Sequence, residues 1–178
     1  KINRQMNYIN LLFFVIFFSC SSQSSENLIS RDGMPDQESW DVVIILTDQG
    51  ITRAKVKSGH LQKYNDKDFI ILDNNVVVDF FDRQEQRTSI LTAEKAEVNE
   101  SSNNMKAIGS VKVLADNGIT LYSETLDWNS KEEKLFTKDY IMITTPDLDT
   151  LYGTGFESDP DLTNWKILKP SGVVGKEF

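Results

Sequence analysis

The chain has 178 residues and a formal net charge of −8, with 27 Asp and Glu against 19 Lys and Arg. This length suits one folded domain plus a short appendage, and a core of adequate size needs no disulfide or metal to support it. The basic residues are scattered among carboxylates. The composition therefore argues against a nucleic-acid partner, which would need clustered Lys and Arg to neutralise phosphates.

The first twenty residues are typical of a secretory signal sequence. Lys1 and Arg4 precede an apolar block at residues 11–18, and Ser19 and Cys20 follow it. The block is about half as long as the roughly 20 apolar residues that a membrane-spanning helix needs. We therefore expect residues 1–20 to be a signal peptide with a lipobox, or a short membrane anchor.

Cys20 is the single cysteine, so it has no partner for an intrachain disulfide. Its position predicts cleavage and diacylation at this residue. Because Phe17 and Phe18 are bulkier than a lipobox usually accepts, the alternative is an unmodified cysteine at the end of an uncleaved anchor. Residues 21–39 start with a Ser-rich run and are predicted to be a flexible polar tether. Either anchor places the following domain outside the cytoplasm.

From residue 40 onward, apolar residues occur in short runs with period two, separated by Asn, Asp and Gly. This pattern predicts an all-β domain over residues 40–178. Turns are expected at residues 73–75, 116–118 and 129–131, where Asn, Asp and Gly tolerate positive φ. The expected strands lie at residues 42–46, 51–57, 69–72, 76–81, 89–98, 111–114, 119–128, 134–136, 140–144 and 164–168.

The domain contains an internal repeat of about thirty residues. Residues 91–99 align with residues 121–129, and residues 111–113 align with residues 141–143. One unit is a pair of strands, with an apolar row that it cannot bury alone. We therefore expect stacked antiparallel hairpins in two facing sheets, which make a twisted β jelly roll or open sandwich.

Alternation along the strands predicts which side chains face the interior. Asp79 and Lys112 are expected to point away from it. The predicted inner row is Val76, Val78, Phe80, Val111, Val113, Ile141 and Ile143.

The sequence offers little material for catalysis or metal binding. His60 is the only histidine and lies in the polar stretch Ser58-Gly59-His60, which we interpret as a surface loop. The run Gly153-Thr154-Gly155 is too short for a nucleotide-binding loop and is interpreted as a bulge or bend. We predict no enzymatic activity, no cofactor and no metal site. Four acidic residues near two prolines are interpreted as turn residues rather than calcium ligands: Asp147, Asp149, Asp159 and Asp161.

The order of these features resembles the LptC family. The resemblance rests on the short N-terminal membrane segment, the stacked hairpins, residues 118–123 leading to Trp128-Asn129, and residues 151–156. It covers roughly residues 51–174, and the same repeat is found in the related LptA proteins and the amino-terminal domain of LptD. The N-terminal anchor favours LptC, although many members keep an uncleaved helix where this chain has Cys20.

The resemblance implies a periplasmic protein at the inner membrane that binds the lipid A acyl chains of lipopolysaccharide in an apolar groove. It implies receipt of this cargo from an LptB-F-G-type ABC transporter and transfer to an LptA-type bridge protein. The inner row would line the groove, and the C-terminal strand, with Trp165 and Ile167, would be an edge for the next jelly roll. An outer-membrane location would instead favour a bridge or accessory role.

Of two other functions, the sequence leaves one open and argues against the second. A structural or adhesive β-sandwich lipoprotein would have a fully packed core and no lipid groove. A secreted hydrolase on a β scaffold would need a nucleophile motif, which the sequence does not show. The state of the inner row, open or packed, distinguishes the lipid carrier from the structural lipoprotein.

Overall fold

The computed structural model describes residues 33–147 and 149–172. The chain divides into two units, and the fold described below is that of the second, which begins at Met34. The expected signal peptide, Cys20 and most of the expected tether lie outside the described residues. Within the described ranges, no helix is long and apolar enough to cross a membrane.

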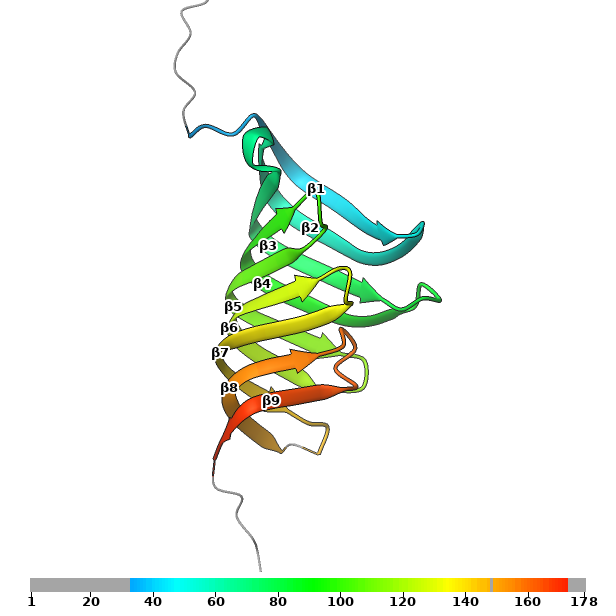
Figure 1. Cartoon of the computed structure of the whole chain (residues 1–178), viewed down its shortest axis with the longest axis vertical. Coiled ribbons are helices and arrows are strands. Elements are labelled where there is room, and N and C mark those ends of the chain that lie inside the picture. Colours follow the sequence, from blue (N-terminus) through cyan, green and yellow to red (C-terminus); the bar gives the residue numbers. More distant parts are fainter. Residues whose placement is uncertain (1–32, 148, 173–178) are drawn as a thin grey trace, which may run out of the picture. The chain divides into compact units, whose positions relative to one another are not determined.

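Nine antiparallel strands form one sheet, and their order in the sheet follows their order in the chain (Figure 1). The expected all-β class is confirmed, and the described residues add only the short 3-10 turn η2 (Asn65–Lys67). The strands are β1 (Gln37–Asp48), β2 (Ile51–Tyr64), β3 (Phe69–Phe81), β4 (Arg87–Asn99), β5 (Met105–Ala115), β6 (Thr120–Asn129), β7 (Lys134–Thr144), β8 (Thr150–Ser158) and β9 (Trp165–Ser171).

The strands bend near their middles, where the pairing register shifts. Extra residues at such bulges bend a strand and change which face its side chains occupy. Figure 1 shows the bends along one side of the sheet and the hairpin turns along the other. The shifts fall between Lys57 and His60, Asp73 and Val76, Thr92 and Lys95, Ile108 and Val111, Ser123 and Asp127, and Thr137 and Tyr140.

The bends divide the sheet into two facing layers. The first layer consists of the strand segments next to the turns at residues 65–68, 100–104, 130–133 and 159–164. The second layer consists of the strand segments next to the remaining turns. The rings of Phe80 in the second layer and Trp128 in the first make an edge-to-face contact, with centroids 5.5 Å apart. The two expected sheets are thus the two halves of a single sheet, and their inner faces form the core.

Two expected strand breaks are wrong. Residues 69–72 and 76–81 belong to one strand, β3, and residues 134–136 and 140–144 both belong to β7. Asn74 and Asn75 have φ of 57° and 64°, the positive values that the sequence indicated, but they form a bulge inside β3 instead of a turn. A bulge and a turn both need residues that tolerate left-handed φ, so the preference of these two asparagines is compatible with either.

The other two expected turns are present. Gly118 has φ of 87° and its amide donates to the carbonyl of Ala115 at 2.9 Å. At the second turn, the side-chain oxygen of Asn129 accepts from the amides of Lys131 and Glu132 at 3.1 Å. The glycine run was correctly interpreted as a bend, since Gly155 has φ of 79° where β8 passes between the layers.

Candidate functional site

The predicted inner row lies in the core of the second layer. All seven residues are at most 2% exposed. Lys112 is exposed on the opposite face, and Asp79 makes an ion pair there with Lys57 at 3.2 Å. The structure therefore brings the predicted row together and separates it from its two predicted outward neighbours.

Three of these residues belong to an aliphatic ladder that crosses the sheet. In the pairing register, each member lies directly opposite the next on the neighbouring strand, so the ladder runs from β1 to β8 without a polar interruption. Its inner rungs are fully buried, and only its last member, Leu151, is exposed to 38%. The aliphatic ladder is Ile44, Val56, Val78, Leu91, Val113, Leu121, Ile143 and Leu151.

The sequence interpretation missed the opposite wall of the interior, which the first layer provides. The bulges shift the alternation by one residue, so β4 buries Leu91 before its bend but Ala96 and Val98 after it. The sequence signal that could have revealed this wall was the change, between Leu91 and Ala96, in which alternate residues are apolar. The buried apolar side chains of the first layer include Leu61, Leu72, Ala96, Ala107, Leu126, Leu135 and Phe156.

The interior is filled by the protein's own side chains. Apart from Leu61, which is 7% exposed, the first-layer residues named above are at most 2% exposed, as is the predicted row. None of the seven row residues lines the pockets beside Arg53, Asp127 or Lys166. Leu162, from the β8–β9 loop, is also completely buried among them. A ligand can enter this interior only if the layers part or a side chain leaves.

Ion pairs connect the two layers at the side where the hairpin turns lie. In β2 of the second layer, Arg53 donates from Nη2 to Glu133 Oε2 at 2.8 Å, and Glu133 belongs to the β6–β7 turn of the first layer. Arg83 Nη2 lies 3.6 Å from the other oxygen of Glu133. The Arg53 side chain is only 9% exposed, and its Nε and Nη1 have no hydrogen-bond partner among the described residues. A pocket of about 430 Å³ adjoins these groups.

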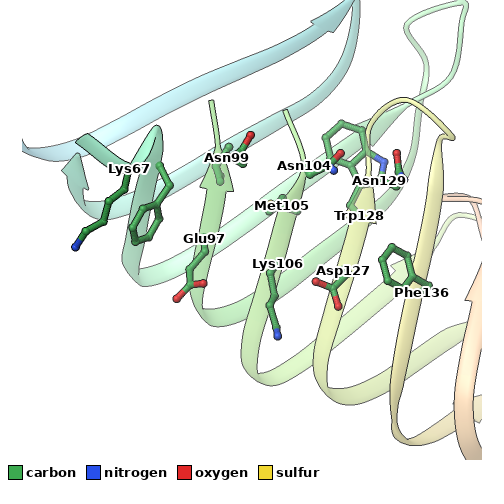
Figure 2. Close-up of a pocket in the computed structure, with 12 residues that line it drawn as sticks. Lys67, Glu97, Asn99, Asn104, Met105, Lys106, Asp127, Trp128, Asn129 and Phe136 are labelled. Carbon is green, nitrogen blue, oxygen red and sulfur yellow. The ribbon is translucent and has the colours of Figure 1, made fainter. Parts of the chain in front are cut away.

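A second pocket, of about 450 Å³, lies at the turn end of the first layer (Figure 2). Phe69 and Phe136 line it together with Glu97, Lys106 and Asp127. In Figure 2 the last three side chains stand on neighbouring strands, and their register places them side by side. Alternation assigns these three side chains to the face opposite the core. Val98, Met105 and Trp128 of the core also line the pocket, so it adjoins the end of the apolar interior.

Two carboxyl groups near these pockets have shifted pKa values. Burial raises the pKa of Asp127, and the positive charge of Lys106 opposes this shift. The hydrogen bond from Lys134 lowers the pKa of Asp159, against a smaller opposing effect of burial. Asp159 is therefore held as an anion at the base of the β8–β9 loop.

His60 does not lie in a loop, as the sequence suggested. It lies in β2 at the bend, because Ser58 and Gly59 form the bulge by which that strand passes between the layers. Its side chain is only 15% exposed, with Nδ1 3.0 Å from Asp73 Oδ1. The Trp40 ring lies over it with a centroid distance of 5.5 Å. These contacts give His60 a structural place between β1 and β3.

Three of the four acidic residues that were interpreted as turn residues make hydrogen bonds within the protein. Asp159 accepts hydrogen bonds from Lys134 and Asn164, and the side chain of Asp161 accepts from the Thr163 amide at 3.0 Å. The Asp149 carbonyl accepts from the Thr145 amide at 3.0 Å. Across residues 33–147 and 149–172, His, Cys, Asp and Glu form no group of three or more that could hold a metal ion.

The two edges of the sheet are β1 and β9, each paired on one side only. Trp165 and Ile167 in β9 pack against the core, whereas Leu168 of the same strand is 44% exposed. Pro170 lies within β9, a position typical of edge strands because proline cannot donate to a ladder. The strand predicted as a docking edge is thus at an edge of the described sheet.

A single antiparallel sheet, bent into two layers around a continuous apolar interior, defines an open β jelly roll. The family described as "Lipopolysaccharide-assembly, LptC-related" matches residues 8–170. The chain therefore belongs to the LptC-related family of lipopolysaccharide-assembly proteins.

The fold is also similar to that of a solved structure, LptH from Pseudomonas aeruginosa. That protein is described as the LptA homologous periplasmic component of the conserved lipopolysaccharide transport device. The TM-score is 0.52 with 12% sequence identity, over 70% of this chain and 87% of LptH. The likeness supports the jelly-roll fold. A search of curated proteins finds no match.

Proposed function

We propose that this protein binds lipopolysaccharide by its lipid A acyl chains between the two layers and passes it outward to another protein. The observation that carries the proposal is the aliphatic ladder, which runs from strand to strand across the sheet. Such a ladder gives hydrocarbon an apolar surface from the β1 edge of the sheet as far as β8, the strand next to the β9 edge. Family membership supports the lipopolysaccharide class of cargo.

The energetics favour such a carrier. An acyl chain gains about 0.8 kcal/mol for each methylene removed from water, so a lipid with several chains needs a covered path across an aqueous compartment. Sugars and phosphates would stay outside the layers. This arrangement lets a chain with a net charge of −8 carry an anionic glycolipid without placing its carboxylates against the phosphates.

The two sheet edges suit two protein partners. We propose that one edge receives cargo from an LptB-F-G-type ABC transporter and that β9 pairs with an LptA-type bridge protein, by addition of one strand to another. Direction would come from the transporter, and the proposed role involves no bond-making step, no cofactor and no metal. The protein would act at the periplasmic face of the inner membrane.

The anchor is a separate proposal. We propose that residues 1–20 are a signal peptide, that Cys20 is the acylated first residue of the mature protein, and that the polar residues after it are the tether. Intact mass of the protein purified from membranes tests this. A species that retains residues 1–19, or a mass unchanged by Cys20→Ala apart from the substitution itself, would contradict acylation and favour the uncleaved anchor.

Photo-crosslinking tests the cargo site. A small diazirine side chain at Val78, Val113 or Ile143 should capture lipopolysaccharide, whereas the same group at Asp79 or Lys112 should not, because neighbours along a strand face opposite sides. Equal capture on both faces would contradict binding between the layers. Val113→Asp is a poor transport test, since Val113 is 0% exposed and a buried unpaired carboxylate would cost several kcal/mol of stability.

A structural or adhesive sandwich remains the second candidate, and one observation favours it. The interior is packed by the protein's own side chains, with the predicted row at most 2% exposed. A carrier must be able to open this interior, whereas a structural protein need not. The same crosslinking series distinguishes them, since a structural sandwich would give no lipid capture at any of the five positions.

A further inference from the structure

The loop between β8 and β9, residues 159–164, reaches from the first layer across to the second. Leu162 at its tip is 0% exposed and lies in the core between the layers. The Ser89 hydroxyl donates to the carbonyl of Pro160, and Asn117 Nδ2 donates to the carbonyl of Asp161 at 3.2 Å. Both donors belong to the second layer, so the loop closes the side where the hairpin turns lie.

The loop is joined at both ends to strands of its own layer, β8 and β9. Asp159 accepts hydrogen bonds from Lys134 of β7 and from Asn164, the latter at 2.8 Å. Within the loop, the Leu162 amide donates to the Asp159 carbonyl at 3.0 Å. The described contacts with the second layer are the two hydrogen bonds to loop carbonyls and the burial of Leu162. Separation is therefore easiest at the second layer, with the loop keeping its shape on the first.

Leu162 differs from the other buried side chains in its backbone. The wall residues belong to strands paired with their neighbours, so moving one of them breaks ladder hydrogen bonds. Leu162 lies outside the strands, at φ of 53°, and can leave the core without disturbing the sheet. An acyl chain that enters a filled interior must displace an apolar side chain of the protein. A leucine on a loop is the side chain whose displacement costs the least free energy.

We propose that the β8–β9 loop is a gate to the interior, and that Leu162 occupies the place that an acyl chain takes when cargo enters. This inference rests on the proposed lipid-carrier function. It adds that the layers open where the loop meets Ser89 and Asn117 of the second layer, while the bends on the opposite side stay closed.

A reversible tether across the gate tests the proposal. Asn117→Cys with Asp161→Cys places one thiol on each side, and a short bis-methanethiosulfonate reagent links them in the folded full-length protein. The readout is capture of lipopolysaccharide by a diazirine group at Ile143. We expect capture by the unlinked double variant, loss of capture after linking, and recovery when a reductant removes the linker.

A matched control uses two turns of the same layer. A Cβ placed on Gly118 would lie 3.0 Å from Pro146, so the β5–β6 and β7–β8 turns are neighbours. Linking Asn117→Cys to Asp147→Cys should therefore leave capture unchanged, and reagent-treated wild type controls for Cys20. Unlinked single-cysteine variants report any effect of the substitutions themselves.

The outcomes separate the gate from the carrier function. If the linked gate variant captures lipid as well as its unlinked form, the gate is wrong and the carrier function stands. If both linked variants lose capture, the loop has no special role and the gate is again wrong. If no protein captures lipid, wild type with the diazirine group included, the carrier function fails and the gate fails with it.

Discussion

Glu133 is the counter-ion of a buried arginine. Glu133→Gln keeps a side-chain oxygen near Arg53 but removes the negative charge that compensates the guanidinium. Nε and Nη1 of Arg53 already have no partner in the part of the chain that the structure describes. We expect the free energy of unfolding to fall by about 1–3 kcal/mol, the usual penalty for a buried polar group left without its partner. Urea unfolding of the purified domain measures this effect.

The neighbouring carboxylate provides the control for this prediction. Glu132 is exposed and makes no side-chain contact among the described ion pairs, so Glu132→Gln should change stability by less than about 0.5 kcal/mol. Arg53→Met, added to Glu133→Gln, should recover part of the loss, because it removes the buried charge itself. An equal effect of the two Glu substitutions would contradict a specific ion pair.

Asp127 should make stability depend on pH in a direction opposite to that of most carboxylates. Burial raises the pKa of Asp127 above its ordinary value of 3.8, so the ionised group costs stability at neutral pH. Well below the ordinary value the carboxyl is neutral in both the folded and unfolded states, and the cost vanishes. Asp127→Asn should therefore raise the Tm at about pH 7 and leave it unchanged at about pH 3. A gain of equal size at both values would contradict this cause.

At the scale of elements, Gly153 allows β9 to approach β8 closely. A Cβ at this position would lie 2.2 Å from the Ile167 side chain and 2.7 Å from the Lys169 carbonyl oxygen. Gly153→Ala should therefore push β9 away and cost about 1–3 kcal/mol, as overpacking in a core does. Hydrogen exchange should show faster exchange in β8 and β9, with little change in β2–β5.

Gly50→Ala is the comparison for that substitution. Gly50 has φ of 83°, but a Cβ there would meet nothing within 4 Å. Its cost should be only the backbone strain of about 1–2 kcal/mol for a left-handed residue, without faster exchange in β9. If both variants loosened β9 equally, the close approach at Gly153 would not be the cause.

The docking role of β9 can be tested with proline at two successive positions. Lys166 and Ile167 both pair regularly with β8, and successive amides of a strand point to opposite edges. Of Lys166→Pro and Ile167→Pro, one should lower stability by removing a bond to β8, and the other should fold and bind an LptA-type partner more weakly. Affinity is measured for whichever variant stays folded. Unchanged binding by that variant would exclude β9 as the docking edge.

The elements themselves were predictable from the sequence to different degrees. Period two and the glycine at position 118 predicted strands and turns correctly, because both depend on local geometry. The bend in β8 was predicted from its glycines, but the bend in β3 was not, since Asn74 and Asn75 have the same preference for positive φ in a bulge as in a turn. Whether such a residue pair reverses the chain or only bends it is decided by pairing with β2 and β4.

At the scale of the whole molecule, the inner row was found by alternation but the gate was not. The contacts that join the layers connect residues far apart in sequence: Arg53 with Glu133, Ser89 with Pro160, and Asn117 with Asp161 are 80, 71 and 44 positions apart. No periodicity or motif encodes such pairs. They depend on how the twist of the bent sheet aligns one row of turns with the other.

The sheet topology also predicts how the domain folds. Every strand pairs with its neighbours in sequence, so the sheet forms by hairpin closures alone, without a long crossover connection. Refolding followed by tryptophan fluorescence should therefore be complete within the range of milliseconds to seconds that β proteins show, and should lie toward its faster end. A dominant phase of minutes would contradict folding by successive hairpins.

The same strand order has a consequence for biosynthesis. A chain that emerges from a translocation pore with its amino end first presents β1 before β2, and each later strand finds its partner already in place. Apart from the outer edge of β1, only the growing edge is unpaired at any moment, so the nascent chain exposes little strand edge to other unfolded chains. Closure of the β8–β9 loop over Ser89 and Asn117 then comes last, when the final strands have left the pore.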